Sequence, residues 1–161
     1  SVQEVVAGLF ESGAEAIRRQ DARWRGVIDA EVDTVIASVG GDPSAVTFLD
    51  LAQAAATAAR AVKKGGRIAL LTAAAPDLGP GAELLRRMDG PTGAKKALAH
   101  EKPADWAAAS LWAYAAKSAG LYLASGYPDE VAEELFCTPI YTPAEAQRLI
   151  DTGSGSVLLI P

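Results

Sequence analysis

The sequences DTVIASVGGDPSAV (residues 33–46) and AVKKGGRIALLTAAAPDLG (residues 61–79) decide the fold of this chain. The first contains a short apolar run, Val35–Ser38, that suits a buried strand. The intervening segment Thr47–Val62 is rich in Ala, Leu and Gln, which are strong helix formers. Arg67–Thr72 is a second apolar run of strand length. Together these segments predict a strand–helix–strand unit.

Glycine pairs punctuate this unit. Gly40–Gly41 follow the first strand, where an open α/β sheet usually places its ligand crevice. They could let the backbone approach an anionic ligand; the alternative is a simple turn that needs unusual dihedrals. Lys63 and Lys64 are expected at the C-terminus of the helix, where positive charge complements the dipole, and Gly65–Gly66 are expected to end it. The first glycine pair is not a dinucleotide fingerprint, because the third glycine is missing.

The remaining patterns extend this unit to an α/β domain. Strands alternate with helices, which implies parallel pairing and right-handed crossovers. We therefore expect a three-layer Rossmann-like domain with a mostly parallel sheet of about 4–5 strands. Further strands are expected at Leu121–Ser125 and Ser156–Ile160. Helices are expected at Val2–Gln20, Gly81–Met88, Thr92–Glu101, Pro103–Ser118 and Pro128–Leu135, and after Thr142, where Thr-Pro-Ala-Glu fits a capping box.

Composition bounds the function. The 161 residues make one domain, 1–161, and half of them are hydrophobic without any run long enough to span a membrane. A net charge of -5 and scattered basic pairs argue against nucleic acid as a partner. The single cysteine indicates a reducing, cytoplasmic location. The chain begins at Ser1 without a signal peptide, as an excised domain of a larger protein would.

Several motifs carry a resemblance to a known family. GGDP at Gly40–Pro43, AVKKGG at Ala61–Gly66 and LG at Leu78–Gly79 match, without a gap, the C-terminal domain of the nickel-dependent lactate racemase family. The segments from residue 104 to 135 and from residue 137 to 161 also resemble the tail of that family. The resemblance covers most of the chain from about Val32 onward.

The resemblance implies a part of an enzyme. Family members interconvert stereoisomers of 2-hydroxy acids by moving a hydride to and from a nickel-pincer nucleotide. That cofactor and the acid–base histidines belong to an N-terminal catalytic domain. This chain would then be the substrate-side C-terminal domain, with no cofactor and no catalytic residue of its own. We expect it to be inactive alone, and the parent protein to be an isomerase.

The resemblance also implies substrate-binding positions. Asp50 and Gln53 stand where the family carries a substrate-contacting Gln and Lys on the helix, and Trp106 matches a Trp near the substrate pocket. Asp42 lies in the glycine turn and completes the predicted set. Because the lysine is replaced by Gln53, we expect a larger hydroxy acid or sugar acid rather than lactate. The alternatives are a first-turn helix acid for Asp50 and packing at the start of a helix for Trp106.

Other readings stay open. His100 and Cys137 are the only histidine and cysteine, so a metal site or a nucleophilic cysteine is not expected. The chain could instead be a stand-alone Rossmann-like small-molecule binding module or a methyltransferase-like domain. A methyltransferase needs a glycine-rich loop after its first strand, and residues 1–31 hold only Gly8, Gly13 and Gly26, at unsuitable spacing. A purely structural domain is a third alternative.

Overall fold

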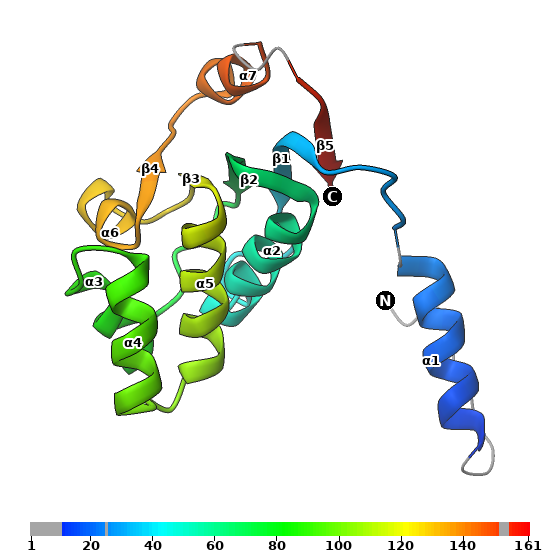
Figure 1. Cartoon of the computed structure of the whole chain (residues 1–161), viewed down its shortest axis with the longest axis horizontal. Coiled ribbons are helices and arrows are strands. Elements are labelled where there is room, and N and C mark those ends of the chain that lie inside the picture. The colour runs from blue at the N-terminus through cyan, green and yellow to red at the C-terminus, as the bar shows by residue number, and fades with distance from the viewer. Residues whose placement is uncertain (1–10, 25, 152–154) are drawn as a thin grey trace.

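A five-stranded parallel sheet forms the centre of the computed structural model, which describes residues 11–24, 26–151 and 155–161 (Figure 1). The strands are β1 (Val32–Ser38), β2 (Val62–Leu71), β3 (Gly120–Ala124), β4 (Cys137–Pro139) and β5 (Val157–Ile160). The helices are α1 (Glu11–Trp24), α2 (Phe48–Ala61), α3 (Pro80–Arg86), α4 (Pro91–Glu101), α5 (Trp106–Ser118), α6 (Asp129–Glu134) and α7 (Pro143–Asp151). The expected three-layer α/β fold is confirmed.

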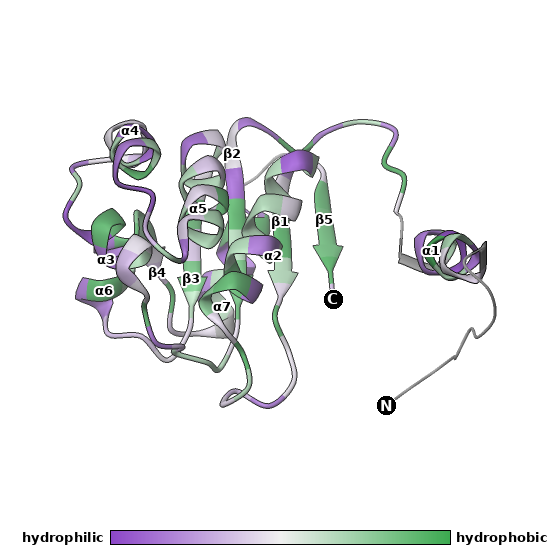
Figure 2. Cartoon of the chain, turned by 90° about the horizontal axis from the view of Figure 1, so that it is seen from below, coloured by the Kyte–Doolittle hydropathy of each residue, from purple (hydrophilic) through white to green (hydrophobic). Residues whose placement is uncertain are grey.

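The strand order β4-β3-β2-β1-β5 determines which helices cover which face of the sheet. From β1 the chain moves in one direction through β2 and β3 to β4, and every pairing is parallel. Right-handed crossovers therefore place α2 to α6 on one face. The chain then returns across the sheet to β5, so α7 lies on the opposite face. Figure 2 shows the strand arrowheads directed toward one edge, which we call the carboxyl edge.

Small side chains let the helices on the first face pack closely. The inner side of α2 is built almost entirely from alanine, with Leu51 and Phe48 as its buried large residues. These side chains meet the alternate strand residues Val35, Ile68 and Leu123, which are also buried. The alanine-rich composition thus reflects a packed core rather than low complexity.

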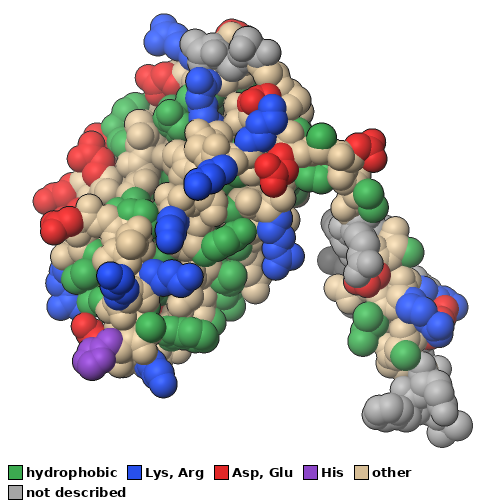
Figure 3. Space-filling model, viewed as in Figure 1, with side chains coloured by type: hydrophobic (Ala, Val, Ile, Leu, Met, Phe, Trp, Pro, Cys, Tyr) green, Lys and Arg blue, Asp and Glu red, His purple; other side chains and the backbone are tan. Residues whose placement is uncertain are grey.

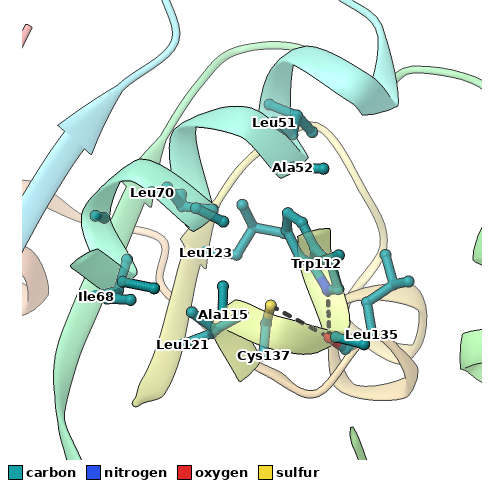
Figure 4. Close-up of a cluster of buried hydrophobic side chains, with 14 of the residues drawn as sticks. Leu51, Ala52, Ile68, Leu70, Trp112, Ala115, Leu121, Leu123, Leu135 and Cys137 are labelled. Atoms are coloured by element: carbon teal, nitrogen blue, oxygen red, sulfur yellow. Dashed lines mark hydrogen bonds between the residues drawn. The ribbon is translucent and has the colours of Figure 1, made fainter. Parts of the chain in front are cut away.

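Trp112 of α5 is the largest fully buried side chain in this core (Figure 4). Its ring centroid lies 5.2 Å from that of Phe48. Its indole Nε1 donates a 2.8 Å hydrogen bond to the Leu135 carbonyl, so its polar atom is satisfied despite burial. The Cys137 thiol points to the same carbonyl at 3.6 Å. Trp112 therefore belongs to the core.

The second face carries a smaller core under α7. Ile36, Ala69 and Ile140 are buried there, and Leu149 and Ile150 of α7 pack against them. α7 begins with the expected capping box: the Thr142 hydroxyl accepts from the Glu145 amide at 3.2 Å, and the Glu145 carboxylate accepts from the amides of Tyr141 and Thr142. By contrast, α1 stands apart from the sheet (Figures 1 and 2). No helix of the described residues is long and apolar enough to cross a membrane.

Three boundaries differ from the sequence-based expectations. The first helix extends to Trp24 rather than ending at Gln20, and Val2–Phe10 lie outside the described residues. Helix α2 ends at Ala61, so the lysines and glycines that follow belong to β2 and not to a helix end. The β1–β2 register shifts between Val32 and Thr34, which leaves residues 63–66 as a bulge with Gly65 at φ +76°. Helix α5 begins at Trp106 rather than at Pro103.

Candidate functional site

The connection from β1 to α2 lies at the carboxyl edge of the sheet. Gly41 adopts φ +103°, a conformation that favours glycine, and Gly40 has open space around its Cα. The Asp42 carboxylate accepts hydrogen bonds from the Ser44 amide at 2.9 Å and the Ser44 hydroxyl at 2.8 Å. These two bonds hold the pKa of Asp42 below its usual value, with the hydroxyl contributing most. Asp42 therefore stabilises its own turn and stays ionised.

Asp50 forms the capping box of α2. Its carboxylate accepts from the Thr47 hydroxyl at 2.6 Å and the Thr47 amide at 2.8 Å, while its own amide donates to the Thr47 hydroxyl at 3.3 Å. The Thr47 hydroxyl bond, followed by the amide bond, lowers the pKa of Asp50. One carboxylate oxygen, Oδ2, receives both bonds, which leaves Oδ1 for a ligand. The structure thus gives Asp50 the helix-start role that was the alternative reading.

Unlike Asp42 and Asp50, the side chains of Gln53 and Trp106 in the predicted set are not used to hold a turn or a helix start. Gln53 is exposed one turn after Asp50 on α2, and none of the hydrogen bonds among the described residues involves its amide. Trp106 opens α5 and is 47% exposed, beside a surface pocket lined by Lys102, Pro103 and Ala107. α2 begins after the carboxyl end of β1, and α5 ends at the amino end of β3, so the first turns of both helices lie toward the carboxyl edge.

The loop after β2 is fixed to this edge by two neighbours. Asp105, which precedes α5, accepts from the amides of Gly81 at 2.6 Å and Ala82 at 3.2 Å, and so caps α3. A Cβ on Gly79 would lie 2.6 Å from the Asp105 carboxylate, which explains the glycine at this position. The Tyr127 hydroxyl donates to the Pro76 carbonyl at 2.5 Å. Burial, together with the nearby charge of Asp77, raises the pKa of Tyr127.

A cavity of about 660 Å³ opens at the carboxyl edge between the sheet and α7. Its apolar wall comes from strand ends and α7, including Ile36, Leu71, Ala124 and Ile150. Its polar groups are the hydroxyls of Ser38, Thr72, Tyr141 and Thr142 and the amide of Gln147. None of its lining residues carries a charge, so it suits a ligand with an apolar body and a few hydrogen-bonding groups.

Tyr141 is the largest polar group at the mouth of this cavity. Its hydroxyl faces the Asp129 carboxylate, and this hydrogen bond raises the pKa of Tyr141 to about 12. The phenol therefore remains protonated at physiological pH, with its proton directed to Asp129 and its oxygen able to accept a hydrogen bond. Its side chain is 64% exposed, so a ligand could reach it without any rearrangement.

The structure divides the predicted site in two. Only Gly40 of the six predicted residues lines the cavity, while Asp50 and Gln53 lie on the surface of α2 and Trp106 lies at the start of α5. The cavity could not be found from the sequence, because its polar residues are common ones from separate parts of the chain, at Ser38, at Thr72, at Tyr141–Thr142 and at Gln147. The capping-box Thr142 was the available signal, since it marked the start of the helix that roofs the cavity.

Within the described residues, the side chains that could ligate a metal do not form a nickel site. Its single histidine, His100, is exposed on α4, whereas its single cysteine, Cys137, is buried among apolar side chains. No group of three or more His, Cys, Asp or Glu side chains gathers within residues 11–24, 26–151 and 155–161. A metal site normally needs such a group.

Comparisons with known proteins add a likeness of fold. The sequence matches no family model and no curated protein. Among solved structures, the lactate racemase apoprotein from Thermoanaerobacterium thermosaccharolyticum superposes with a TM-score of 0.69 at 19% sequence identity. The match covers 81% of this chain and 34% of that one, so the chain spans about a third of the racemase. The domain therefore has a lactate-racemase-like fold.

Proposed function

We propose that this chain is the substrate-side C-terminal domain of a lactate-racemase-like protein that acts on a hydroxy acid other than lactate. The observation that carries the proposal is the fold likeness across 81% of the chain, combined with the GGDP and AVKKGG motifs in the same order. In this proposal an N-terminal domain of the same protein binds the nickel-pincer nucleotide, which supplies the hydride chemistry. This chain contributes surface and positioning groups only.

The chemistry of the exposed edge supports a hydroxyl-rich substrate. Gln53 offers a neutral amide where an ammonium group would pair with a carboxylate, and charge-assisted bonds are about twice as strong as neutral ones. Asp50 adds a negative charge one turn earlier, although Thr47 already engages one of its oxygens. The carboxylate Oδ1 and the Gln53 amide can bind hydroxyl groups of a polyol chain. Trp106, at the start of α5, provides an exposed apolar face toward the same edge of the sheet.

The test uses the complete parent protein loaded with its cofactor. We expect sugar acids to be racemised or epimerised with a higher kcat/KM than lactate. Gln53→Ala should raise KM for the preferred substrate by about tenfold, the effect of losing one or two hydrogen bonds. Thr57→Ala is the matched control, because Thr57 is exposed on the same helix one turn away from the edge. Efficient lactate racemisation that is indifferent to Gln53→Ala would contradict the proposal.

The uncharged cavity under α7 favours a second candidate function. A stand-alone module could bind a small neutral molecule there, with the Tyr141, Thr142 and Gln147 side chains as polar contacts. A thermal-shift screen of neutral hydroxylated compounds on the isolated chain tests this reading. Ala146→Leu should fill the cavity and abolish any shift, whereas Ala144→Leu, which is exposed on α7 outside the cavity, should not. Binding to the isolated chain that Ala146→Leu removes would favour the module.

A further inference from the structure

A second cavity, of about 390 Å³, lies at the edge of the sheet opposite the candidate functional site. It forms where the end of α2, the start of β2, the first half of α4 and the end of α5 converge. Ala59 and Val62 form its apolar floor. Its remaining lining residues are Glu31, Lys64, Lys95, Tyr114, Lys117 and Ser118. We call this feature the lysine cavity.

The lysine cavity concentrates positive charge in an acidic protein. Among the ion pairs of the described residues, Lys63 is bound to Asp33 at 2.8 Å, but Lys64, Lys95 and Lys117 have no carboxylate partner. Glu31 is the only acid in the lining. Figure 3 shows Lys and Arg side chains gathered over the part of the surface that carries α2, α4 and α5. The whole chain has a net charge of -5, so the positive charge around this cavity is opposite in sign to that of the protein as a whole.

Helix dipoles account for only part of this excess. The C-terminal ends of α2 and α5 each carry a partial charge of roughly -0.5 at this edge. Together with Glu31 they offset about two of the three lysine charges, which leaves a net charge of about +1. Lys95 lies in the second turn of α4 and serves no helix end. A concave surface with a net positive charge focuses the field and attracts an anion.

Tyr114 gives the lysine cavity a second type of contact. Its ring is 45% exposed on α5, one turn before Lys117 and Ser118. An exposed aromatic ring beside ammonium groups can stack on a nucleobase while the lysines bind the phosphate. The Ser118 hydroxyl donates to the Tyr114 carbonyl at 2.9 Å, which fixes this last turn.

We propose that the lysine cavity binds a small phosphorylated ligand with an aromatic ring, of the nucleoside monophosphate class. The lysines contact the phosphate and the Tyr114 ring stacks on the base. The cavity lies within the size range of small-molecule sites. It shares no residue with the carboxyl edge, so the inference is independent of the proposed function.

The experiment is a titration of the isolated full chain with each probe at low salt, and two-dimensional amide NMR monitors binding. The probes are AMP, ribose 5-phosphate, inorganic phosphate and adenosine. We expect AMP to bind most tightly and ribose 5-phosphate more weakly, with shifts confined to residues around the lysine cavity. Tyr114→Leu should reduce AMP binding to the level of ribose 5-phosphate without changing the latter. Equal binding of inorganic phosphate and AMP would overturn the stacking, and no saturable binding by any probe would overturn the site.

A matched pair of variants separates the site from general charge. Lys95→Gln and Lys96→Gln make the same change at adjacent exposed positions on α4, but only Lys95 lines the cavity. Lys95→Gln should weaken AMP binding by about tenfold, as expected for one charge-assisted hydrogen bond. Lys96→Gln should weaken AMP binding by less than about twofold, because salt screens the interaction between the ligand and a charge outside the cavity. Equal losses in both variants, or tighter binding of a single-stranded oligonucleotide than of AMP, would show a diffuse polyanion surface and overturn the proposal.

Discussion

Gly79 is a glycine because of the Asp105 carboxylate, and this coupling can be measured. Gly79 has an ordinary φ of -81°, so a side chain there suffers no backbone strain. The three heavy atoms nearest to a Cβ at Gly79 all belong to Asp105, with Oδ2 at 2.6 Å, Cγ at 2.8 Å and Cβ at 3.3 Å. A Gly79→Ala substitution must therefore displace the carboxylate that caps α3.

The magnitude follows from the bonds that would be lost. Asp105 receives the amides of Gly81 and Ala82, and loss of such an N-cap costs about 1–2 kcal/mol. We expect both Asp105→Ala and Gly79→Ala to lower the free energy of unfolding by about 2 kcal/mol. In the Asp105→Ala background the two closest atoms, Oδ2 and Cγ, are gone, and only the Cβ of residue 105 remains near, at 3.3 Å. There Gly79→Ala should cost little, because the remaining 3.3 Å contact needs only a small shift, and restriction of the unfolded chain can offset it by about 0.4–1 kcal/mol.

The assay is urea unfolding of the parent, the two single variants and the double variant. Tryptophan fluorescence monitors unfolding, since Trp112 is buried in the core that α3 covers. The double-mutant cycle should give a coupling of about 2 kcal/mol. Asp89→Ala, at an exposed position just after α3, is the control and should change stability by less than about 0.5 kcal/mol. Additive effects of Gly79→Ala and Asp105→Ala would refute the steric reasoning.

Three further predictions test other contacts. Asp33 binds Lys63 and Ser156, and these contacts lower its pKa, so its contribution to stability is present above the unfolded-state pKa and is lost as the pH falls through the folded-state pKa. Urea unfolding should therefore show that Asp33→Asn is less stable than the parent at pH 7 and that this difference shrinks in acid. A difference that stays constant with pH would contradict this. Burial raises the pKa of Cys137, so its thiol should react with a disulfide reagent much more slowly in the folded chain than in urea, and equal rates would show that the thiol is accessible. Trp112→Phe removes the indole donor of the Leu135 carbonyl and leaves a void, so it should lower the free energy of unfolding by about 2–4 kcal/mol, whereas the same change at exposed Trp106 should cost less than about 1 kcal/mol.

Much of the fold could be predicted because it rests on local signals. The β-branched run before Gly40–Gly41 identified β1, and the alanine-rich segment that follows identified α2. Thr142 and Glu145 supplied a capping box that the structure reproduces. Alternation of such elements implies a parallel sheet with right-handed crossovers. The placement of α7 on the face opposite α2 then depends on the strand order, which no local pattern encodes.

Some boundaries could not be predicted because tertiary pairing overrode local propensity. Lys63–Gly66 look like the end of a helix, yet their backbone belongs to a strand that pairs with β1 around a bulge. Pro103 is a favourable first residue of a helix, but α5 starts at Trp106, and the carboxylate of the preceding Asp105 binds amides at the start of α3. The role of Asp50 in the capping box was open from sequence, because a first-turn acid fits both a cap and a ligand contact.

The sequence by itself determined the elements of this protein, the alanine-rich core and the placement of Gly40–Gly41 and the predicted site residues at strand and helix ends. These follow from periodicity, propensity and capping, which act over a few residues. Only the tertiary structure decided that Gly40 borders a cavity under α7 while Gln53 and Trp106 lie on another surface. Likewise, only the fold brings Lys64, Lys95 and Lys117 around one cavity. Cavities form between segments distant in the chain, so they depend on strand order and helix packing rather than on any local pattern.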